Sequence, residues 1–266
     1  MARSIVTLTT DFGSSDHYVG VMKGVILNIN PEAEIVDICH DIHAYDVLEG
    51  AFAIAQAYRY FPPRTIHLVV VDPGVGTARR PILVAADKYY FVAPDNGVLS
   101  LVFDREENAL VRHITSNHYF LEPVSQTFHG RDVFAPIAGW LSRQVETDKF
   151  GEPITDFVRF HVPPPKRVTD RLLKGMILRV DRFGTLVTNI TPEDLPQLFA
   201  ENPPDFKIIV GKMEISRLKT TYAQGAPGEV FAILGSSGYL EIAANRASAT
   251  TTLGVSKGAE VGVIFT

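Results

Sequence analysis

Polar side chains gather in three segments of the N-terminal half, each directly after a short apolar run. They are residues 9–16, with two aspartates; residues 40–43, with two histidines; and residues 72–80, with an aspartate, two glycines and two arginines. Ligands of open α/β sheets bind outside the carboxyl ends of the strands, so the three segments together predict a ligand site. Taken singly, each is equally well explained as a turn, because Asp and Gly are common turn residues.

The composition of these segments favours a sugar-like group over a phosphate. Residues 72–77 lack the Gly-Lys-Ser/Thr ending of a phosphate-binding loop, and no GxGxxG fingerprint opens a helix there. Carboxylates would repel a phosphate, whereas a carboxylate can accept both hydroxyl protons of a ribose diol. A nucleoside or a sugar is therefore the expected ligand.

A mixed histidine and carboxylate metal site is a competing interpretation of the same segments. The residues that could form it are Asp11, Asp16, His40, His43, Asp72 and His129. Two of them, His40 and His43, lack the spacing of a helical HExxH zinc motif. Scattered histidines are more often ordinary core or surface residues, so we expect no metal and no cofactor.

Residues 126–132 place His129 directly before an apolar helical pattern over residues 133–140. If the fold brings His129 to Asp72 and Arg79, the three could handle a proton: the carboxylate accepts from a water, and Arg79 and His129 stabilise developing negative charge. The spacing alone does not bring them together. The adjacent Arg131 and Asp132 are explained more simply as charges at the start of a helix.

In the C-terminal half, three segments that run from a strand into a turn combine aromatic rings with amide and hydroxyl groups. They are residues 181–189, 220–222 and 235–246. Aromatic planes beside hydrogen-bonding groups suit a purine ring. Most aromatic residues belong to a core, so this pattern by itself is weak.

The elements that must position these residues differ between the two halves. Apolar runs at residues 4–9, 35–38, 65–71 and 89–93 predict strands, and residues 18–29 and 47–60 have the apolar spacing of helices. Near-continuous apolar strands indicate an α/β sandwich with a largely parallel sheet. After residue 170, short apolar segments at residues 176–180, 186–190, 206–210, 230–234, 238–243 and 260–265 predict a small β-barrel or sandwich.

A run of three prolines at residues 163–165 marks the expected boundary between the halves. We expect an α/β domain over residues 1–162, a proline-rich linker over residues 163–170 and a β-barrel domain over residues 171–266. The charge changes at the same place. Residues 1–165 have 13 basic and 20 acidic side chains, whereas residues 166–266 have 12 basic and 10 acidic ones.

The whole composition is that of a soluble globular protein. The chain has 266 residues, 46% of them hydrophobic, a net charge of -5 and one cysteine, Cys39. A single cysteine forms no internal disulfide, and neither a signal peptide nor an 18-residue apolar run is present, so we expect a cytoplasmic protein away from membranes. Without a basic stripe, a small molecule is a more suitable partner than a nucleic acid.

Taken together, these segments resemble the S-adenosyl-L-methionine (SAM) hydroxide adenosyltransferases, or SAM hydrolases, the family that also includes the fluorinase and the chlorinase. The resemblance covers nearly the full chain, and seven segments in the right order are far more specific than any one of them. They are residues 10–24 (TDFGSSDHYVGVMKG), 30–31 (NP), 46–51 (DVLEGA), 71–77 (VDPGVGT) with Arg79 and Arg80, 93–97 (APDNG), 127–131 (TFHGR) and 237–243 (SGYLEIA).

The resemblance implies an N-terminal α/β domain, a C-terminal β-barrel and a homotrimer with sites between neighbouring subunits. It also implies the reaction, in which SAM and water give adenosine and L-methionine. Asp72, Arg79 and His129 match the family residues that position the nucleophilic water.

The resemblance likewise implies the residues that bind the substrate. Asp11 matches the ribose-binding aspartate, and either Asp16 or Asp181 would contact the methionine end. The other matched positions are Tyr45 and Phe183 in the pocket walls, Tyr222 stacked on adenine, Asn245 and Arg246 at the adenine edge, Thr185 at a methionine contact, and Ser236 as a further substrate-binding position. The family often has Asn where Thr185 stands, so that contact is expected to be shorter, water-bridged or lost.

Two alternatives remain beside SAM hydrolysis. One is halide-dependent adenosyl transfer, as in the chlorinase; the fluorinase and chlorinase have Tyr at the position of Asp72, and the fluorinase has Ser at that of Gly130. Asp72 argues for water, because a carboxylate repels a halide and accepts hydrogen bonds from water. The other alternative is a non-catalytic protein that binds adenosine or SAM in the same pocket.

Overall fold

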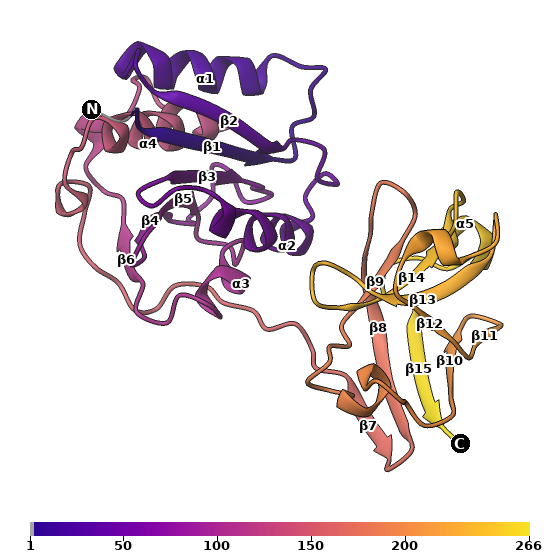
Figure 1. Ribbon diagram of the computed structural model, residues 1–266. Helices are drawn as coiled ribbons and strands as arrows, with labels where there is room; N and C mark the ends of the chain where they lie inside the picture. The colour runs from indigo at the N-terminus through magenta and orange to yellow at the C-terminus, as the bar shows by residue number, and fades with distance from the viewer. Residues whose placement is uncertain (1–2) are drawn as a thin grey trace. The chain divides into compact units, whose positions relative to one another are not determined.

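The computed structural model describes residues 3–266 and forms two compact units, one ending at His161 and the other beginning at Val162. Figure 1 traces the chain through both units. The segment expected to be a linker, residues 163–170, contains strand β7 (Lys166–Thr169), which pairs with β8 (Leu172–Val180). The expected linker is therefore part of the C-terminal sheet, because only its prolines lack the backbone N–H that strand pairing needs.

The N-terminal unit is built on a six-stranded sheet with the order β2-β1-β3-β5-β4-β6. Neighbouring strands are parallel from β2 to β5, and β4 is antiparallel to both of its neighbours. The sheet is therefore largely parallel, as expected. Its strands are β1 (Ile5–Thr10), β2 (Glu34–Cys39), β3 (Ile66–Val70), β4 (Pro81–Ala85), β5 (Tyr90–Pro94) and β6 (Leu110–His113).

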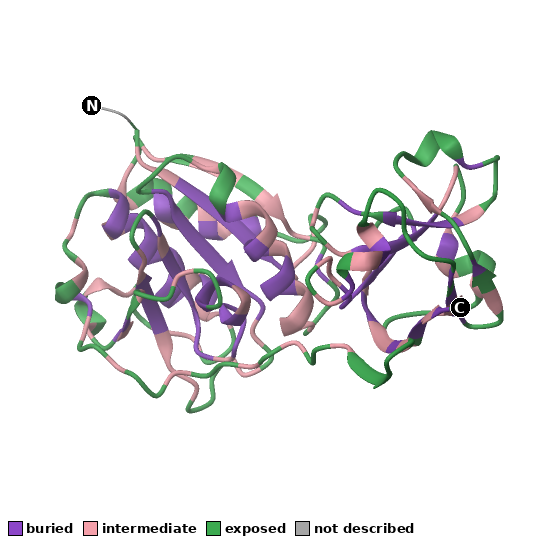
Figure 2. Cartoon of the chain, turned by 60° about the horizontal axis from the view of Figure 1, so that its bottom comes forward, coloured by how far each residue is buried: buried purple, intermediate pink, exposed green. Residues whose placement is uncertain are grey.

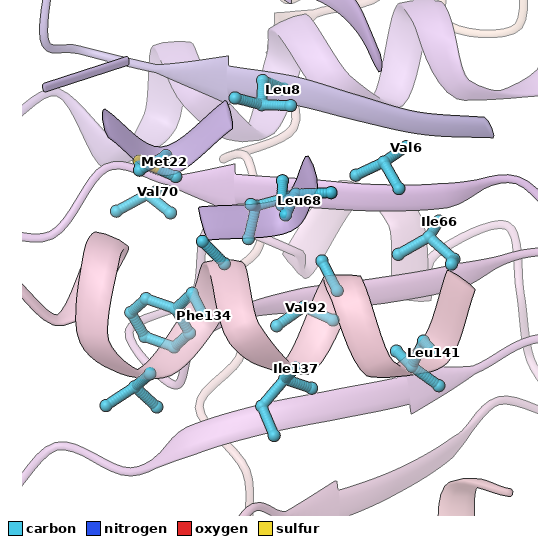
Figure 3. Packing of buried hydrophobic residues seen from close by; sticks show 14 of the residues in the cluster. Val6, Leu8, Met22, Ile66, Leu68, Val70, Val92, Phe134, Ile137 and Leu141 are labelled. Carbon is cyan, nitrogen blue, oxygen red and sulfur yellow. The ribbon is translucent and has the colours of Figure 1, made fainter. Parts of the chain in front are cut away.

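Helices cover both faces of this sheet. On one face lie α1 (Tyr18–Ile29) and α4 (Ala135–Ser142), and on the other lie α2 (Val47–Ala57) and α3 (Ser100–Phe103). Strand β3 alternates between the two cores: Leu68 and Val70 face α1 and α4, while Val69 faces α2. Figure 3 shows the first core, with side chains of α4 against those of β3 and β5. Burial on both faces explains why these strands have nearly continuous apolar sequences.

The helix over residues 18–29 is confirmed, and its buried side chains, Val19, Met22 and Ile26, recur with helical spacing. The second expected helix is shorter than predicted, because α2 ends at Ala57 and a 3₁₀ turn follows over Tyr58–Tyr60. α2 begins where the Asp46 carboxylate accepts a hydrogen bond from the backbone N–H of Glu49 at 3.0 Å. Strands β4 and β6 were not expected from the sequence.

The C-terminal unit is one nine-stranded sheet that curves into a half-barrel around a main apolar core, with a small second cluster formed by Phe231, Ile233 and Ala243. Its order is β11-β10-β15-β8-β9-β14-β13-β12, with β7 beside β8, and all its pairs are antiparallel except β12 with β13. The remaining strands are β9 (Leu186–Thr188), β10 (Phe206–Val210), β11 (Met213–Ile215), β12 (Leu218–Lys219), β13 (Val230–Leu234), β14 (Leu240–Ala244) and β15 (Glu260–Phe265).

Helix α5 (Ala249–Leu253) follows β14 in this unit. In Figure 2 the buried residues are concentrated in the strands of both units, and the connecting loops are largely exposed. Among residues 3–266, no helix is both long enough and apolar enough to cross a membrane.

Candidate active site

The carboxyl ends of β1 and β3 place two aspartates side by side in the N-terminal unit. Asp11 follows β1 directly, and Asp72 follows β3 after Val71. Because the two strands are parallel neighbours, their last residues lie at the same edge of the sheet. Asn96 fixes the end of β3, since its side-chain amide donates to the carbonyl of Val71 at 2.8 Å.

Arg79 contacts both Asp72 and His129. The Arg79 Nε donates to both Asp72 oxygens at 2.9 Å, and its Nη2 contacts Oδ2 as well. The same Nη2 is 2.8 Å from Nδ1 of His129. The side chains of Asp72 and Arg79 are only 5% and 8% exposed, so the charges lie in a site with little solvent screening.

The contact with Arg79 defines the protonation state of His129. A guanidinium has only donors, so Nδ1 of His129 must accept, and the proton of the neutral ring lies on Nε2. Burial and the positive charge of Arg79 lower the pKa of His129 below its usual range, which favours the same neutral form. The ring therefore presents an Nε2–H donor on its other side.

The loop from Asp72 to Arg80 can approach the loop before His129 only because residue 76 is glycine. Gly76 has φ +76°, and a Cβ there would overlap the backbone carbonyl oxygen of Gln126. Thr77 holds the turn, as its hydroxyl donates to the carbonyl of Gly74 at 2.6 Å. This close approach brings Arg79 to His129.

A helical segment presents His129 to this cluster. His129 caps a π-helical turn (Gly130–Phe134) that continues into α4. The preceding loop is anchored by the buried Asp132, whose carboxylate accepts from the backbone N–H of Ser125 at 2.8 Å and pairs with Arg131. Arg131 and Asp132 therefore start and anchor the helix, as the simpler explanation from the sequence had it.

Asp11 lies beside this cluster with its carboxylate oriented by the chain after β2. Oδ2 of Asp11 accepts a hydrogen bond from the backbone N–H of Tyr45 at 2.8 Å. Burial raises the pKa of Asp11, the Tyr45 N–H opposes this, and the negative charge of Asp72 adds to the increase. Tyr45 itself is 73% exposed with φ +69°, and Asp16 is exposed in the loop before α1.

The two histidines of residues 40–43 serve local structure. Nδ1 of His40 is 2.9 Å from the Thr10 hydroxyl, and its Nε2 is 3.0 Å from Asp37. His43 contacts the carboxylate of Glu49 at 2.7 Å. Throughout residues 3–266, no three His, Cys, Asp or Glu side chains come together in a group able to hold a metal ion.

The C-terminal unit has a cavity of about 560 Å³ of its own, in the size range of small-molecule sites. Five of the expected site residues line it together with Ala244 and Ala247: Asp181, Phe183, Thr185, Tyr222 and Arg246. Asp181 shapes one wall, because its Oδ1 accepts from the backbone N–H groups of Phe183 and Thr185 at 2.9 and 2.8 Å. Phe183 is 80% exposed and Tyr222 is half-exposed, so both rings are available to a ligand.

Two other expected residues are placed differently. The side-chain amide of Asn245 donates to the carbonyl of Gly225 at 2.7 Å and so fixes the turn that carries Tyr222. The backbone N–H of Asn245 donates to the carbonyl of Glu229 at 3.1 Å, and its carbonyl accepts from the N–H of Gly228 at 2.8 Å, so both backbone groups of Asn245 are already paired. Arg246, the next residue, is the one that lines the cavity. Ser236 is exposed and does not line the cavity.

One residue near this cavity was not among the sequence candidates. Glu241, the second residue of β14, is 7% exposed, and its carboxylate contacts the hydroxyls of Tyr222 and Ser237. An ionisable side chain inside an otherwise apolar strand, Leu-Glu-Ile-Ala-Ala, is the signal that could have identified it.

Comparisons with known proteins identify the same family over both units of the chain. A family model described as "SAM hydroxide adenosyltransferase N-terminal domain" matches residues 6–151, and one described as the C-terminal domain of the same family matches residues 175–262. A Salinispora tropica protein named "(R)-S-adenosyl-L-methionine hydrolase" is 35% identical in an alignment of 263 positions that covers 95% of each chain.

A more distant relative from Nocardia brasiliensis, named "Fluorinase", is 29% identical and covers 98% of this chain and 97% of its own. The crystal structure of an uncharacterized conserved protein from Thermotoga maritima matches with a TM-score of 0.89 and 36% identity, over 98% of this chain and 99% of that one. The two domain matches together span most of the sequence. The chain therefore belongs to the SAM hydroxide adenosyltransferase family.

Proposed function

We propose that this protein hydrolyses SAM by attack of water at C5′, which gives adenosine and L-methionine. The observation that carries the proposal is the contact of Asp72, Arg79 and His129 in a member of this family. Asp72 and His129 together offer a carboxylate acceptor and an Nε2–H donor, the pair of groups needed to hold one water.

The reaction requires little beyond the placing of that water. Attack at C5′ breaks the bond to a sulfonium and releases a neutral thioether, so the leaving group needs no proton. The water loses one proton as the C–O bond forms, and the Asp72 carboxylate is the group placed to accept it. Arg79 orients the Asp72 carboxylate through its hydrogen bonds, and holding the water in line with the C–S bond supplies much of the rate.

The substrate contacts are assigned on the same basis. Asp11 binds the ribose diol beside Asp72, with Tyr45 and Asp16 in the flanking loops. The cavity of the C-terminal unit takes the base and the methionine end, with Tyr222 and Phe183 as aromatic walls and Asp181, Thr185 and Arg246 as polar ones. Thr185 provides a shorter side chain than the Asn that the family often has at its position. Ser236 and Asn245 are further substrate contacts proposed from the family resemblance.

The second candidate function is halide-dependent adenosyl transfer, since named fluorinases are among the relatives. Two features disfavour it. The Asp72 carboxylate occupies the centre of the cluster and would repel a halide. A Cβ at Gly130, where the fluorinase has Ser, would lie 3.1 Å from both the Met22 sulfur and the Phe128 ring, so the backbone there has little room for a side chain.

Incubation with SAM in ¹⁸O-water tests the proposal directly. Hydrolysis at C5′ should release methionine and adenosine, with ¹⁸O on the 5′-oxygen. Both sulfonium epimers should be tested, because the named relatives act on the (R) form by name. Absence of both products above background would refute the proposal. Formation of halogenated deoxyadenosine in the presence of chloride or fluoride would instead support halide-dependent adenosyl transfer. SAM binding without turnover, unchanged in Asp72→Ala, would indicate the non-catalytic alternative, and loss of activity on chelation would indicate a metal enzyme.

The assembly and cellular location are proposed from the family resemblance and the sequence. A homotrimer with sites at subunit contacts is expected, and light scattering on the purified protein measures its mass. A reducing cytoplasmic location suits a chain whose single cysteine, Cys39, is unpaired. Cell fractionation checks that location.

A further inference from the structure

Glu241 is a buried carboxyl whose partners lie on two different loops. It is the second residue of β14, a strand that lies between β13 and β9, and it pairs with Ile233 and Val187. Its Oε1 accepts from the Ser237 hydroxyl at 3.2 Å, and its Oε2 accepts from the Tyr222 hydroxyl at 3.4 Å. A buried carboxylate destabilises the fold unless it is hydrogen-bonded, so the contacts with the Ser237 and Tyr222 hydroxyls stabilise Glu241 at this position.

The backbone near Glu241 is adapted to this carboxylate. A Cβ at Gly235 would overlap both the Oε1 and the carboxyl carbon of Glu241. Only glycine therefore lets the β13–β14 turn pass over the carboxyl group while Ser237 donates to it. Burial raises the pKa of Glu241, and the nearby Asp181 carboxylate raises it further, whereas Ser237, Tyr222 and Arg179 lower it.

Tyr222 connects this buried group to the cavity. Its ring lines the cavity, is half-exposed and packs against Phe231 at 6.3 Å between ring centroids. Its backbone belongs to a short turn (Tyr222–Gln224) that the Asn245 side chain fixes through Gly225. The hydroxyl contact with Glu241 fixes the far end of the ring, so the ring plane is set from both ends.

We propose that Glu241 is a positioning residue: through the Tyr222 hydroxyl it fixes the plane on which the substrate's base stacks. This inference rests on the proposed function for its substrate, and it adds a residue outside the cavity lining to the binding machinery. An exposed ring that is already oriented loses less conformational freedom when the base stacks on it. Loss of the contact should therefore weaken binding of the nucleoside and leave the attack on C5′ unchanged.

The test compares Glu241→Met, which keeps the length of the side chain but has no oxygen to accept a hydrogen bond, with Tyr222→Phe and the double variant in the full-length protein. Each single variant should raise KM for SAM and the Kd for adenosine about 3- to 10-fold, the range expected for one hydrogen bond. The kcat should stay within about two-fold of wild type, since neither group is assigned a part in handling the attacking water. The double variant should bind adenosine with the same Kd as the weaker-binding single variant, because both changes remove the same contact.

Ser237→Ala is the matched control, since it removes the other hydrogen bond of the same carboxylate without touching Tyr222. It should lower the melting temperature with little change in adenosine Kd. If Ser237→Ala raises Kd as much as Tyr222→Phe, or if the effects of Glu241→Met and Tyr222→Phe simply add, Glu241 only stabilises the fold and the proposal is wrong.

Adenosine affinity keeps this test separate from the proposed reaction. If the wild type binds adenosine but does not turn over SAM, the proposed function fails while the Kd values still decide the role of Glu241. If Glu241→Met does not fold, the adenosine Kd of Tyr222→Phe decides alone, and an unchanged Kd overturns the proposal. A wild type that binds no adenosine overturns it as well.

Discussion

Asp72 and Arg79 form a nearly buried ion pair, and this affects how their substitution should be interpreted. Removing one partner of a buried pair leaves an uncompensated charge and typically costs about 3–5 kcal/mol of stability. Arg79 also packs over the Phe134 ring, 5.1 Å from its centroid, so its guanidinium is held by the helical segment that carries His129. Activity losses at these two positions must therefore be measured beside stability.

Asp72→Asn should lower kcat for SAM hydrolysis by about 10²- to 10⁴-fold, the usual contribution of a general base. The amide retains the size of the carboxylate but cannot accept a proton at neutral pH. Steady-state product formation measures the effect, with thermal melting run in parallel. Asp156→Asn removes an exposed aspartate that pairs with Arg80 and should change kcat little. A kcat for Asp72→Asn within about three-fold of wild type would contradict the role of Asp72.

The pH dependence of kcat/KM should be governed at the acidic side by His129. The cluster needs this ring neutral, and its pKa is lowered by burial and by Arg79. Activity should therefore persist as the pH falls through the ordinary histidine value of about 6.5 and decline only at lower pH, when His129 gains a proton. A pH–rate profile tests this, and His129→Gln should remove that limb. A limb centred at or above pH 6.5 that survives in His129→Gln would contradict the assignment.

At the scale of elements, parallel strands and one close loop contact assemble the cluster. β1 and β3 deliver Asp11 and Asp72 to one sheet edge, and the π-helical turn before α4 delivers His129. The contact of Gly76 with Gln126 joins these two parts of the chain. Preorganisation of the cluster therefore depends on a residue with no side chain.

Gly76→Ala should both destabilise the fold and reduce activity. The new methyl group overlaps the Gln126 carbonyl, so the loops must separate, and Arg79 moves away from His129. We expect a loss of about 1–3 kcal/mol in unfolding free energy and a fall in kcat of at least about ten-fold. Denaturant unfolding and steady-state kinetics measure the two effects.

Gly258→Ala is the matched control for backbone strain. Gly258 also has a positive φ, +85°, but a Cβ there would meet nothing within 4 Å. This variant should show the cost of the backbone conformation alone and leave kcat unchanged. Equal kcat losses in both variants would mean that the loop contact has no special role.

At the scale of the whole molecule, a buried histidine links stability to pH. His67 in β3 is fully buried among Tyr58, Tyr89 and Phe91, and its Nδ1 is 2.7 Å from the Thr7 hydroxyl. Burial lowers its pKa to about 3. The folded protein therefore holds this ring neutral where an unfolded chain would protonate it, at about pH 6.5 and below.

The contribution of neutral, buried His67 to the free energy of unfolding should be fully present above about pH 6.5 and should decline as the pH falls toward 3. The slope is about 1.4 kcal/mol per pH unit for one proton. Urea unfolding at several pH values measures this slope. The double variant His67→Phe with Thr7→Val should take up about one proton fewer on unfolding, so its stability should depend less on pH by that slope. His161→Gln, at a largely exposed histidine, should leave the pH dependence unchanged. An unchanged slope in the double variant would show that other groups cause the acid sensitivity.

The sequence by itself determined the two fold classes and the residue types of the site. Apolar periodicity identified α1 and the strands of the N-terminal core, since a sheet buried on both faces requires continuous apolar runs. It missed β4 and β6, whose short segments owe their pairing to neighbours distant in the chain. It also extended α2 into the turn at Tyr58, and it left β7 in a linker.

Only the tertiary structure decided which polar residues meet. Asp72 and His129 are 57 positions apart, and no local pattern predicts that Arg79 contacts both. The structure also separated His40 and His43 from the cluster and placed Glu241 behind Tyr222. The physical reason is that secondary structure follows from local propensity and burial, whereas the geometry of a site depends on contacts between segments that only the folded sheet and its loops bring together.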